Sequence, residues 1–381
     1  MSSIYDEEHR LFRESFRSWV ANEISPRLAE FENAGLVDRE VFAEAGKHGF
    51  VGMAIDEAYG GSGANDYRFN AVLAEEAAYA GLGGCGTGFG LHNDIVTPYF
   101  IEYCNAEQAN RWMPGIASGK LITAIAMTEP GTGSDLASVK AHAVLDGDEW
   151  VLNGAKTFIT NGINSDLVIV VCRTRAEAGS DSLSLLVVER GMEGFERGRK
   201  LEKIGLRSSD TAELFFNDVR VPGANLLGEE GKGFEYLGFN LAQERMWVAV
   251  TGLAAAEAAL NWTVDYVKER SAFGQPIASF QNTKFVLADV STEIEVTRPF
   301  IEQCILKLNE GKLTPAQAAR AKLWGSELQN RVIDKCLQLF GGYGYMAEFP
   351  IGQAYVDARI SPIYAGTNEI MKTIISKDVL S

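Results

Sequence analysis

The sequence predicts an α+β multidomain protein with three consecutive parts: an all-helical domain over 1–120, a β domain over 121–225 and a helical bundle over 226–381. Near both ends of the chain, apolar residues recur three and four positions apart, which is the spacing of an amphipathic helix. Between them lie short runs rich in branched and aromatic residues, bounded by Gly, Asn, Asp and Ser, which is typical of strands. A chain of 381 residues is long enough for two or three such domains.

The first domain is predicted from segments such as SFRSWVANEI (15–24) and RFNAVLAEEAAYA (68–80), whose apolar residues would share one face of a helix. Two glycine-rich stretches, YGGSGAND (59–66) and GLGGCGTGFG (81–90), are predicted as turns that separate the helices. The second begins with GLGGCG, which matches the G-x-G-x-x-G dinucleotide fingerprint. That motif needs a strand before it and a βαβ unit around it, whereas a helical pattern precedes it here, so a turn between helices is favoured.

The middle domain is predicted from the runs LVIVVC (167–172), LSLLVV (183–188) and ELFFNDVRV (213–221). No helical stretch of any length separates these runs. Parallel strands need such crossovers, so we expect an antiparallel sheet, closed into a barrel or paired in a sandwich.

The last domain shows the longest helical periods. Within 286–308, one stripe keeps a spacing of three or four residues: Val286, Val290, Ile294, Thr297, Ile301, Ile305 and Leu308. The next helix is predicted to begin at Thr314 as N-cap, with Pro315 in its first position and Gln317 completing a capping box. It is predicted to end at Gly341 and Gly342, which can adopt the left-handed conformation that closes helices.

Composition excludes several classes of protein. The net charge of −16 argues against a nucleic-acid binder, because phosphate backbones are bound mainly by Lys and Arg. No apolar run reaches the roughly 18 residues of a membrane span, and the acidic start lacks the features of a signal or transit peptide. We therefore expect a cytoplasmic protein.

Neither disulfides nor a metal site is predicted, because cysteines and histidines lack the required spacing: Cys85, Cys104, Cys172, Cys304, Cys336, His9, His48, His92 and His142. His92 near the glycine-rich stretch could line a pocket, but a hydrogen-bonded structural role is favoured.

The segment AMTEPGTGSD (126–135) carries the first sign of chemistry, because backbone N–H groups in such a turn can hydrogen-bond an electron-rich heterocycle. The alternative is a loop with ordinary Asx and Ser turns and no binding role, which would have a similar sequence. The segment also resembles the first signature of the acyl-CoA dehydrogenase family. Further segments resemble its other cofactor motifs in the same order: KTFITNG (156–162), RSAFGQPIASFQ (270–281), QLFGGYGY (338–345) and IYAGTNEI (363–370).

The resemblance covers nearly the whole chain and implies a helical domain, a β-barrel, a four-helix bundle and FAD as the cofactor. It implies that Met127 and Thr128 meet the pyrimidine edge of the flavin, and Phe158 and Thr160 its N5 side. It further implies cofactor contacts, some from a neighbouring subunit, by Ser134, Arg270, Phe273, Gln281, Gln338, Gly341, Gly342, Thr367 and Glu369. Substrate contacts are implied for Ser134, Arg245, Tyr364, Ala365 and Gly366.

One departure from the family pattern concerns the base that takes a proton from the substrate. Many members place a glutamate just after the tyrosine of the IY-x-GT motif, where this chain has Ala365. A branch of the family that includes the long-chain and isovaleryl enzymes carries its glutamate on the first long bundle helix, directly before an arginine. LAQERMWVAV (241–250) matches that pattern with Glu244 and Arg245, so we interpret Glu244 as the base rather than as a solvated helix carboxylate.

The resulting hypothesis is FAD-dependent α,β-dehydrogenation of a saturated acyl-CoA to the trans-2-enoyl-CoA, in fatty-acid β-oxidation. By resemblance, the partners would be an electron-transfer flavoprotein and further copies of the chain, in a homotetramer or homodimer. A flavin oxidase or monooxygenase on the same fold and a branched-chain acyl-CoA dehydrogenase are the alternatives. A non-catalytic scaffold on a degenerate fold is a third, disfavoured by the intact cofactor segments.

Overall fold

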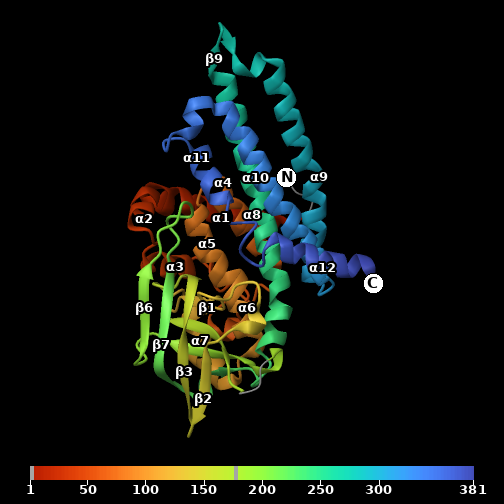
Figure 1. Ribbon diagram of the computed structural model, residues 1–381. Coiled ribbons are helices and arrows are strands. Elements are labelled where there is room, and N and C mark those ends of the chain that lie inside the picture. Colours follow the sequence, from red (N-terminus) through yellow and green to blue (C-terminus); the bar gives the residue numbers. More distant parts are fainter. Residues whose placement is uncertain (1–3, 176–178) are drawn as a thin grey trace.

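The computed structural model describes residues 4–175 and 179–381, and they form the three parts that the sequence predicts (Figure 1). Helices come first, a sheet follows, and long helices complete the chain, so the predicted fold class is confirmed. One buried apolar cluster includes side chains from all three parts, and a second lies among the N-terminal helices. The boundaries predicted at 120 and 225 stay predictions.

The N-terminal part consists of short helices whose apolar faces pack together: α1 (Glu7–Trp19), α2 (Leu28–Ala34), α3 (Arg39–Lys47), α4 (Tyr67–Tyr79), α5 (Gly83–Gly90), α6 (Thr97–Tyr103) and α7 (Ala106–Ala117). A π-helical turn, η4 (Leu91–Val96), joins α5 to α6. It carries His92, which is fully buried with its ring nitrogens beside the Ile116 carbonyl and Thr123. The structural role expected for His92 is therefore confirmed.

The turn predicted over 81–90 is wrong, because Gly83–Gly90 is helix α5. Glycine is a poor helix former, but the absence of side chains lets this helix approach its neighbours closely. A Cβ on Gly84 would lie 2.8 Å from the Ser208 backbone nitrogen, and one on Gly90 would lie 2.2 Å from Nε1 of Trp247. Packing against the β domain and the long helix α8 therefore outweighs the intrinsic preference of glycine.

Over the described residues, the middle part is one mixed sheet of eight strands: β1 (Thr123–Ala126), β2 (His142–Asp146), β3 (Glu149–Thr160), β4 (Leu167–Arg173), β5 (Leu183–Glu189), β6 (Phe195–Lys200), β7 (Thr211–Pro222) and β8 (Leu226–Leu227). Seven of them follow the order β6-β7-β3-β2-β4-β5-β8, and β1 pairs with β4 off this path. Strands β4 and β5 are buried almost throughout, which explains their continuous apolar runs.

The prediction of a purely antiparallel sheet is wrong, because the sheet contains parallel pairs. Strand β1 runs parallel to β4 through four residue pairs, and β2 meets β4 in parallel at His142. The connection from β1 to β4 contains the β2–β3 hairpin and a single 3-10 turn (Leu136–Ser138) rather than an α-helix, so the parallel pair forms without a long helical crossover.

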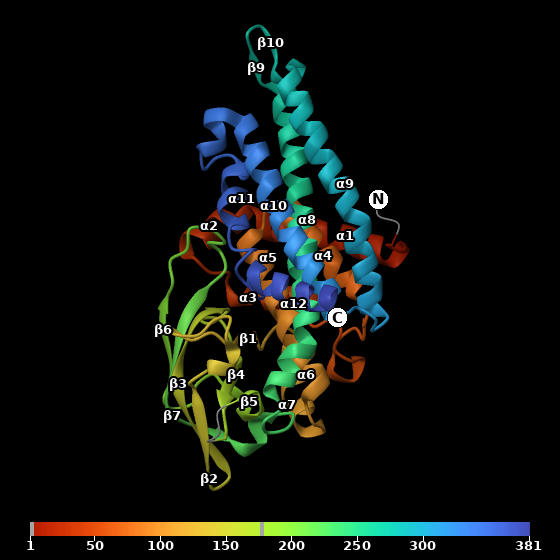
Figure 2. The ribbon, with the colours of Figure 1, turned by 45° about the vertical axis from the view of Figure 1, so that its right-hand side comes forward.

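The C-terminal part is built on three long helices, α8 (Gly233–Glu269), α9 (Gln281–Asn309) and α10 (Pro315–Phe340), followed by α11 (Pro350–Ala358) and α12 (Asn368–Leu380). Figure 2 shows the long helices side by side, with a small hairpin, β9 (Ser271–Ala272) and β10 (Gln275–Pro276), at the end remote from the sheet. The capping box at Thr314 and the end of α10 before Gly341 are confirmed. Among the residues described, no helix combines the length and apolarity needed to cross a bilayer.

Candidate active site

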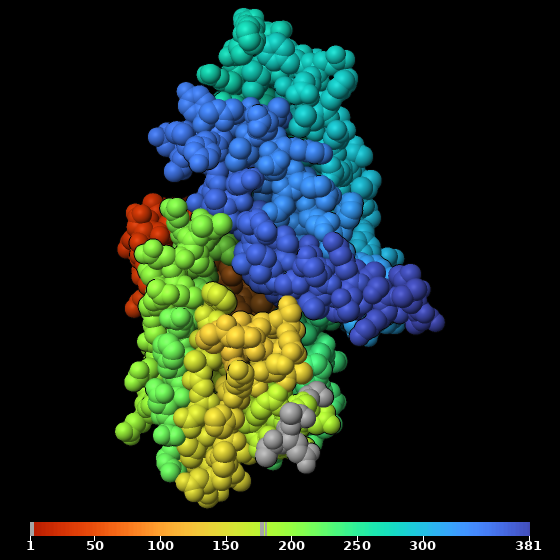
Figure 3. Space-filling model, viewed as in Figure 1, coloured from red at the N-terminus to blue at the C-terminus, as the bar shows by residue number. Residues whose placement is uncertain are grey.

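A cavity of about 430 Å³ lies where the three parts of the chain meet. Its walls come from α5 and η4, from the strand ends around Met127 and Phe158, from α8, and from the loop before α12. Figure 3 shows a hollow on this side of the molecule, between the yellow and green β domain and the dark blue C-terminal segment. The cavity therefore collects side chains that are far apart in the sequence.

Two segments of the β domain are fixed to each other beneath this cavity by a buried lysine. Nζ of Lys156 donates to the carbonyl of Met127 and to Oε1 of Glu129, both at 2.9 Å. The backbone N–H of Thr157 also donates to the carbonyl of Thr128 at 2.9 Å. Burial acts to raise the pKa of Glu129, but hydrogen bonds from the Ala141 N–H and from Lys156 outweigh it and lower that pKa. The segments 126–135 and 156–162 therefore form one preorganised wall.

A β-bulge directs Phe158 into the cavity. The register of β3 against β7 shifts between Lys156 and Ile159, and Phe158 has a φ of +60°, which is rare for an aromatic residue. Bulges commonly turn a side chain out of the sheet beside a binding site. The ring of Phe158 is 68% exposed, so this wall presents a bare aromatic surface that a planar heterocycle can cover.

Glu244 lines the same cavity from α8 and is 4% exposed. Its Oε1 accepts a hydrogen bond of 3.3 Å from the Tyr99 hydroxyl. Burial raises the pKa of Glu244 to about 7, against the opposing effects of the Arg245 charge and the Tyr99 hydrogen bond. A carboxyl group with this pKa exchanges a proton readily near neutral pH, as a general base must.

The loop before α12 contributes Tyr364, Ala365 and Gly366 to the wall of the cavity. Ala365 has a φ of +53°, a strained conformation for a residue with a Cβ. The loop is held from below by Lys322 of α10, whose Nζ donates to the Gly366 carbonyl at 2.8 Å and to Oδ1 of Asn368 at 2.9 Å. Burial and then the nearby Arg245 charge lower the pKa of Lys322 to about 8. The strained peptide is therefore anchored by a buried amine.

Arg245 reaches the cavity beside Glu244. Burial lowers the pKa of its guanidinium, while the Glu244 charge raises it. Within the part of the chain that the structure describes, its Nε is buried without a hydrogen-bond partner. A buried donor without a partner is costly, so Arg245 has unused capacity to bind an acceptor in the cavity.

The structure brings ten of the sequence-predicted residues together in this one cavity: Met127, Thr128, Ser134, Phe158, Thr160, Glu244, Arg245, Tyr364, Ala365 and Gly366. A second cavity, of about 500 Å³, contains Arg270, Gln338, Gly341 and Gly342. Phe273, which is 96% exposed, lies in the connection between β9 and β10, and Gln281 begins α9. Thr367 is the N-cap of α12, and Glu369 lies in its first turn.

Sequence reasoning missed several residues that line the main cavity, notably Trp247, Thr87 and Ile95. Trp247 stands three positions after Glu244 on α8, so helical spacing alone indicates that both side chains share one side of the helix. For Thr87 and Ile95 no such signal exists, because the local sequence does not predict that α5 and η4 are helical.

Comparison with known proteins decides the family. Models of the acyl-CoA dehydrogenase N-terminal, middle and C-terminal domains match residues 6–120, 124–219 and 231–380. The chain belongs to the acyl-CoA dehydrogenase family. It is 51% identical over 380 residues to the mitochondrial long-chain specific acyl-CoA dehydrogenase of Sus scrofa, covering 99% of this chain and 87% of that one.

Solved structures agree. An acyl-CoA dehydrogenase from Geobacillus kaustophilus matches with a TM-score of 0.96 and 48% identity, covering 100% of both chains. A glutaryl-CoA dehydrogenase from Mycobacterium smegmatis, in complex with FADH2, matches with a TM-score of 0.92 and 25% identity, covering 99% of this chain and 95% of that one.

The enzyme is therefore an FAD-dependent acyl-CoA dehydrogenase of fatty-acid oxidation. The cavity fits this cofactor, because the fixed wall of Met127, Thr128 and Thr160 offers polar backbone and hydroxyl groups beside the bare ring of Phe158. When bound, FAD supplies the acceptor for a hydride.

Proposed function

We propose that Glu244 removes the proton from Cα of the acyl-CoA thioester, while the hydride leaves Cβ for the cofactor and the trans-2-enoyl-CoA is formed. The observation that carries this proposal is the position of Glu244, a buried carboxyl group in the same cavity as Phe158 and Ala365. Ala365 has no carboxyl group of its own, whereas Glu244 lines the same cavity and carries one.

The backbone of the 364–366 loop has a complementary role. Removing the proton from Cα places negative charge on the thioester oxygen, and a preorganised N–H donor stabilises such charge. The N–H of Ala365 is the donor that we assign to this oxygen. Its conformation is held by Lys322 through the Gly366 carbonyl, so the donor does not need to reorganise during the reaction.

The assignment predicts a pH dependence. Glu244 must be deprotonated to accept a proton, and burial raises its pKa to about 7. We therefore expect kcat/KM to rise about tenfold per pH unit below that value and to level off above it, because kcat/KM reports the free enzyme. Steady-state assays over a range of pH with one acyl-CoA test this. A kcat/KM that is level from acid to neutral pH would exclude a base with such a pKa.

Assembly and electron transfer extend the proposal. Arg270 is the C-cap residue of α8 and lies 26 residues beyond Glu244, about 40 Å away at 1.5 Å per residue. This separation supports an oligomer, a homotetramer or homodimer, in which Arg270, Phe273, Gln281, Gln338, Gly341 and Gly342 reach the cofactor of another subunit. We assign an electron-transfer flavoprotein as the acceptor of the electrons, as the family resemblance implies.

The choice between straight and branched substrates is tested by flavin bleaching. The relative from Sus scrofa is named as long-chain specific, which supports a straight-chain substrate. We expect a saturated straight-chain acyl-CoA to bleach the flavin without oxygen, and isovaleryl-CoA to do so at least about tenfold more slowly. Faster bleaching by isovaleryl-CoA would select the branched-chain alternative. Rapid oxygen consumption during turnover would select an oxidase, and a purified protein that takes up no FAD would select a scaffold.

A further inference from the structure

The carboxyl group of Glu244 is held by a residue that lies outside the active-site cavity. The hydroxyl group of Tyr99 donates to Oε1 of Glu244 at 3.3 Å, and the two side chains are 0% and 4% exposed. Tyr99 belongs to α6 and is not among the residues that line the cavity, whereas Glu244 is. Tyr99 can therefore influence the reaction through Glu244, but not by touching the substrate.

Helix α6 is attached to α8 at a second level, one helical turn beyond Tyr99. The ring of Tyr103 stacks on that of Tyr236, with 3.9 Å between the centroids and 24° between the planes. Nδ2 of Asn240 also donates to the Tyr103 hydroxyl at 3.4 Å. Positions 99 and 103 on α6, and 236, 240 and 244 on α8, are spaced by four, so each set shares one face of its helix. The two helices therefore meet along one seam that includes the base (Figure 2).

The segment before α6 fixes the position of this seam. Nε2 of Gln243, the residue before the base, donates to the Asp94 carbonyl of η4 at 3.1 Å. Oγ1 of Thr97, the first residue of α6, donates to the His92 carbonyl at 2.6 Å. Turns of π-helix such as η4 are rare and occur frequently at functional sites. The backbone that carries Tyr99 is therefore connected to α8 immediately beside the base.

The hydrogen bond matters because a carboxyl group does not fix its own orientation. The last torsion of a Glu side chain is broad and roughly two-fold, so contacts rather than rotamer preference set the plane of the group. Proton transfer requires the two heavy atoms to lie about 2.6–3.2 Å apart. A hydrogen bond from a buried tyrosine to Oε1 fixes the plane of the Glu244 carboxyl group and leaves Oε2 to take the proton.

We propose that Tyr99 is the positioning residue for the base: its hydroxyl holds Oε1 of Glu244, so that Oε2 faces the Cα proton of the acyl-CoA. This inference rests on the proposed function, because it takes Glu244 as the base. The proton passes from Cα to Oε2, the electrons of the broken C–H bond stay on the substrate, and Tyr99 keeps its own proton. A hydroxyl group donates more strongly to a carboxylate than to a neutral acid, so the bond also favours the form that accepts a proton.

The charges around the base give Tyr99 a measurable effect on pH dependence. Burial raises the pKa of Glu244 to about 7, against the Arg245 charge and the Tyr99 hydrogen bond, which both lower it. The pKa of Tyr99 itself is raised well above its usual value, by burial and by the Glu244 charge, so its hydroxyl stays protonated. The other titratable groups on the surrounding elements are Tyr103 on α6, Asp94 on η4, Lys322 on α10, Tyr364 before α12 and Asp135 after β1. Removing the Tyr99 hydroxyl should therefore raise the pKa of the base.

The test is Tyr99→Phe, which removes one hydroxyl group and keeps the ring in its buried space. We expect the rate of flavin bleaching at saturating acyl-CoA to fall by about tenfold, because the base is less well placed. The acyl-CoA concentration that gives half the maximal rate should stay within about twofold. The midpoint of the kcat/KM profile should move to higher pH, by about one unit. Anaerobic stopped-flow absorbance and steady-state assays over a range of pH measure these effects, with the straight-chain acyl-CoA that bleaches the wild type fastest.

A double variant shows whether Tyr99 acts through Glu244. In the Glu244→Gln background there is no carboxylate to hold, so adding Tyr99→Phe should leave the residual bleaching rate unchanged within about twofold. A further loss of about tenfold in that background would show that Tyr99 acts independently of the base, and would overturn the proposal.

The matched control is Tyr5→Phe, because the Tyr5 hydroxyl also donates to a buried glutamate, at 2.8 Å to Oε1 of Glu75, and neither residue lines the cavity. It should change neither the bleaching rate nor the pH midpoint. A Tyr99→Phe enzyme that matches the wild type in both would overturn the proposal and leave the role of Glu244 intact. A slower rate with an unchanged pH midpoint would indicate a purely structural role and would also overturn it. If Glu244→Gln itself bleaches fully, the proposed function has failed instead.

Discussion

Replacing Glu244 by Gln is expected to leave a yellow, FAD-loaded enzyme whose flavin is no longer bleached by acyl-CoA. The amide keeps the shape of the side chain but cannot accept the Cα proton, and loss of a general base costs about 10²–10⁴-fold in rate. Because the side chain is buried and contacts Tyr99, the neutral amide should be tolerated structurally. Anaerobic stopped-flow absorbance of the flavin measures the effect.

Two further variants make this result specific. Glu235→Gln removes an exposed carboxylate from the first turn of the same helix and should bleach normally. Glu244→Ala combined with Ala365→Glu moves the carboxyl group to another residue that lines the same cavity and should regain part of the lost rate. Full bleaching by Glu244→Gln would refute the assignment, and absence of any recovery in the double variant would show that the two positions do not reach the same proton.

Replacing Lys156 by Met should have the second large effect, on stability and on FAD retention. The substitution leaves Glu129 buried without its charged partner, and breaking a buried ion pair from one side typically costs about 3–5 kcal/mol. It also releases the Met127 carbonyl, so the two segments of the cofactor wall lose their connection. Urea unfolding followed by circular dichroism, together with FAD content after gel filtration, measures both consequences.

The control for Lys156 is its neighbour Lys140, whose side chain is exposed although its backbone N–H donates to Glu129. Lys140→Met should change neither the unfolding midpoint nor the FAD content. Adding Glu129→Gln to Lys156→Met removes the isolated charge and should restore part of the stability. If Lys156→Met unfolds at the same urea concentration as the wild type, the ion pair does not support the wall.

Much of this architecture could be predicted because the relevant signals are local. The stripe on α9, the cap at Thr314 and the apolar runs of β4 and β5 each depend on residues close together in the chain. The role of Glu244 could also be predicted from the sequence, since the segment around it resembles a branch of the family and Ala365 lacks a carboxyl group. These features require no knowledge of distant contacts.

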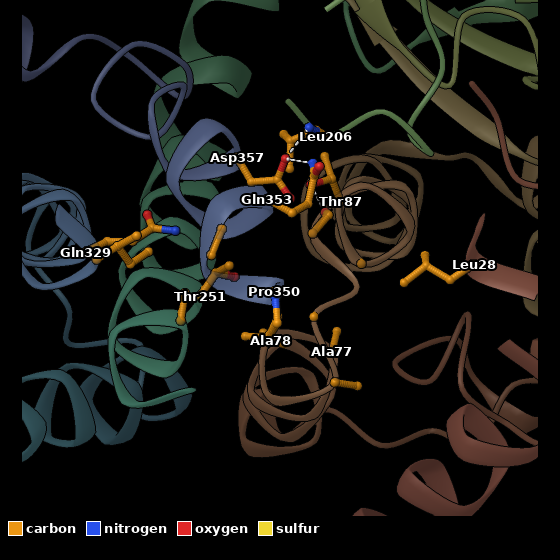
Figure 4. Close-up of a pocket in the computed structure, with 18 of the residues that line it drawn as sticks. Leu28, Ala77, Ala78, Thr87, Leu206, Thr251, Gln329, Pro350, Gln353 and Asp357 are labelled. Carbon is orange, nitrogen blue, oxygen red and sulfur yellow. Dashed lines mark hydrogen bonds between the residues drawn. The ribbon is translucent and has the colours of Figure 1, made fainter. Parts of the chain in front are cut away.

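Other features depend on contacts that no local pattern contains. The glycines of helix α5 let it pack directly against Ser208 and Trp247, which are distant in sequence. This packing stabilises the helix. The parallel pairing of β1 with β4 depends on the path of the hairpin between them. A cavity of about 300 Å³ is lined jointly by α2, α4, α5, α8, α10 and α11 (Figure 4), so its volume follows from packing between elements that are distant in sequence.

The glycine-rich helix also limits how this enzyme can be made more heat-resistant. A common engineering step replaces helical glycines by alanine, which reduces the freedom of the unfolded chain. Alanine cannot replace Gly84 or Gly90 without disturbing the packing, because the added methyl group would overlap Ser208 or Trp247. At Gly88 the nearest atoms lie 3.3 Å and 3.4 Å away, so an alanine there would need its neighbours to yield only slightly. Attempts at thermostabilisation should therefore leave Gly84 and Gly90 unchanged.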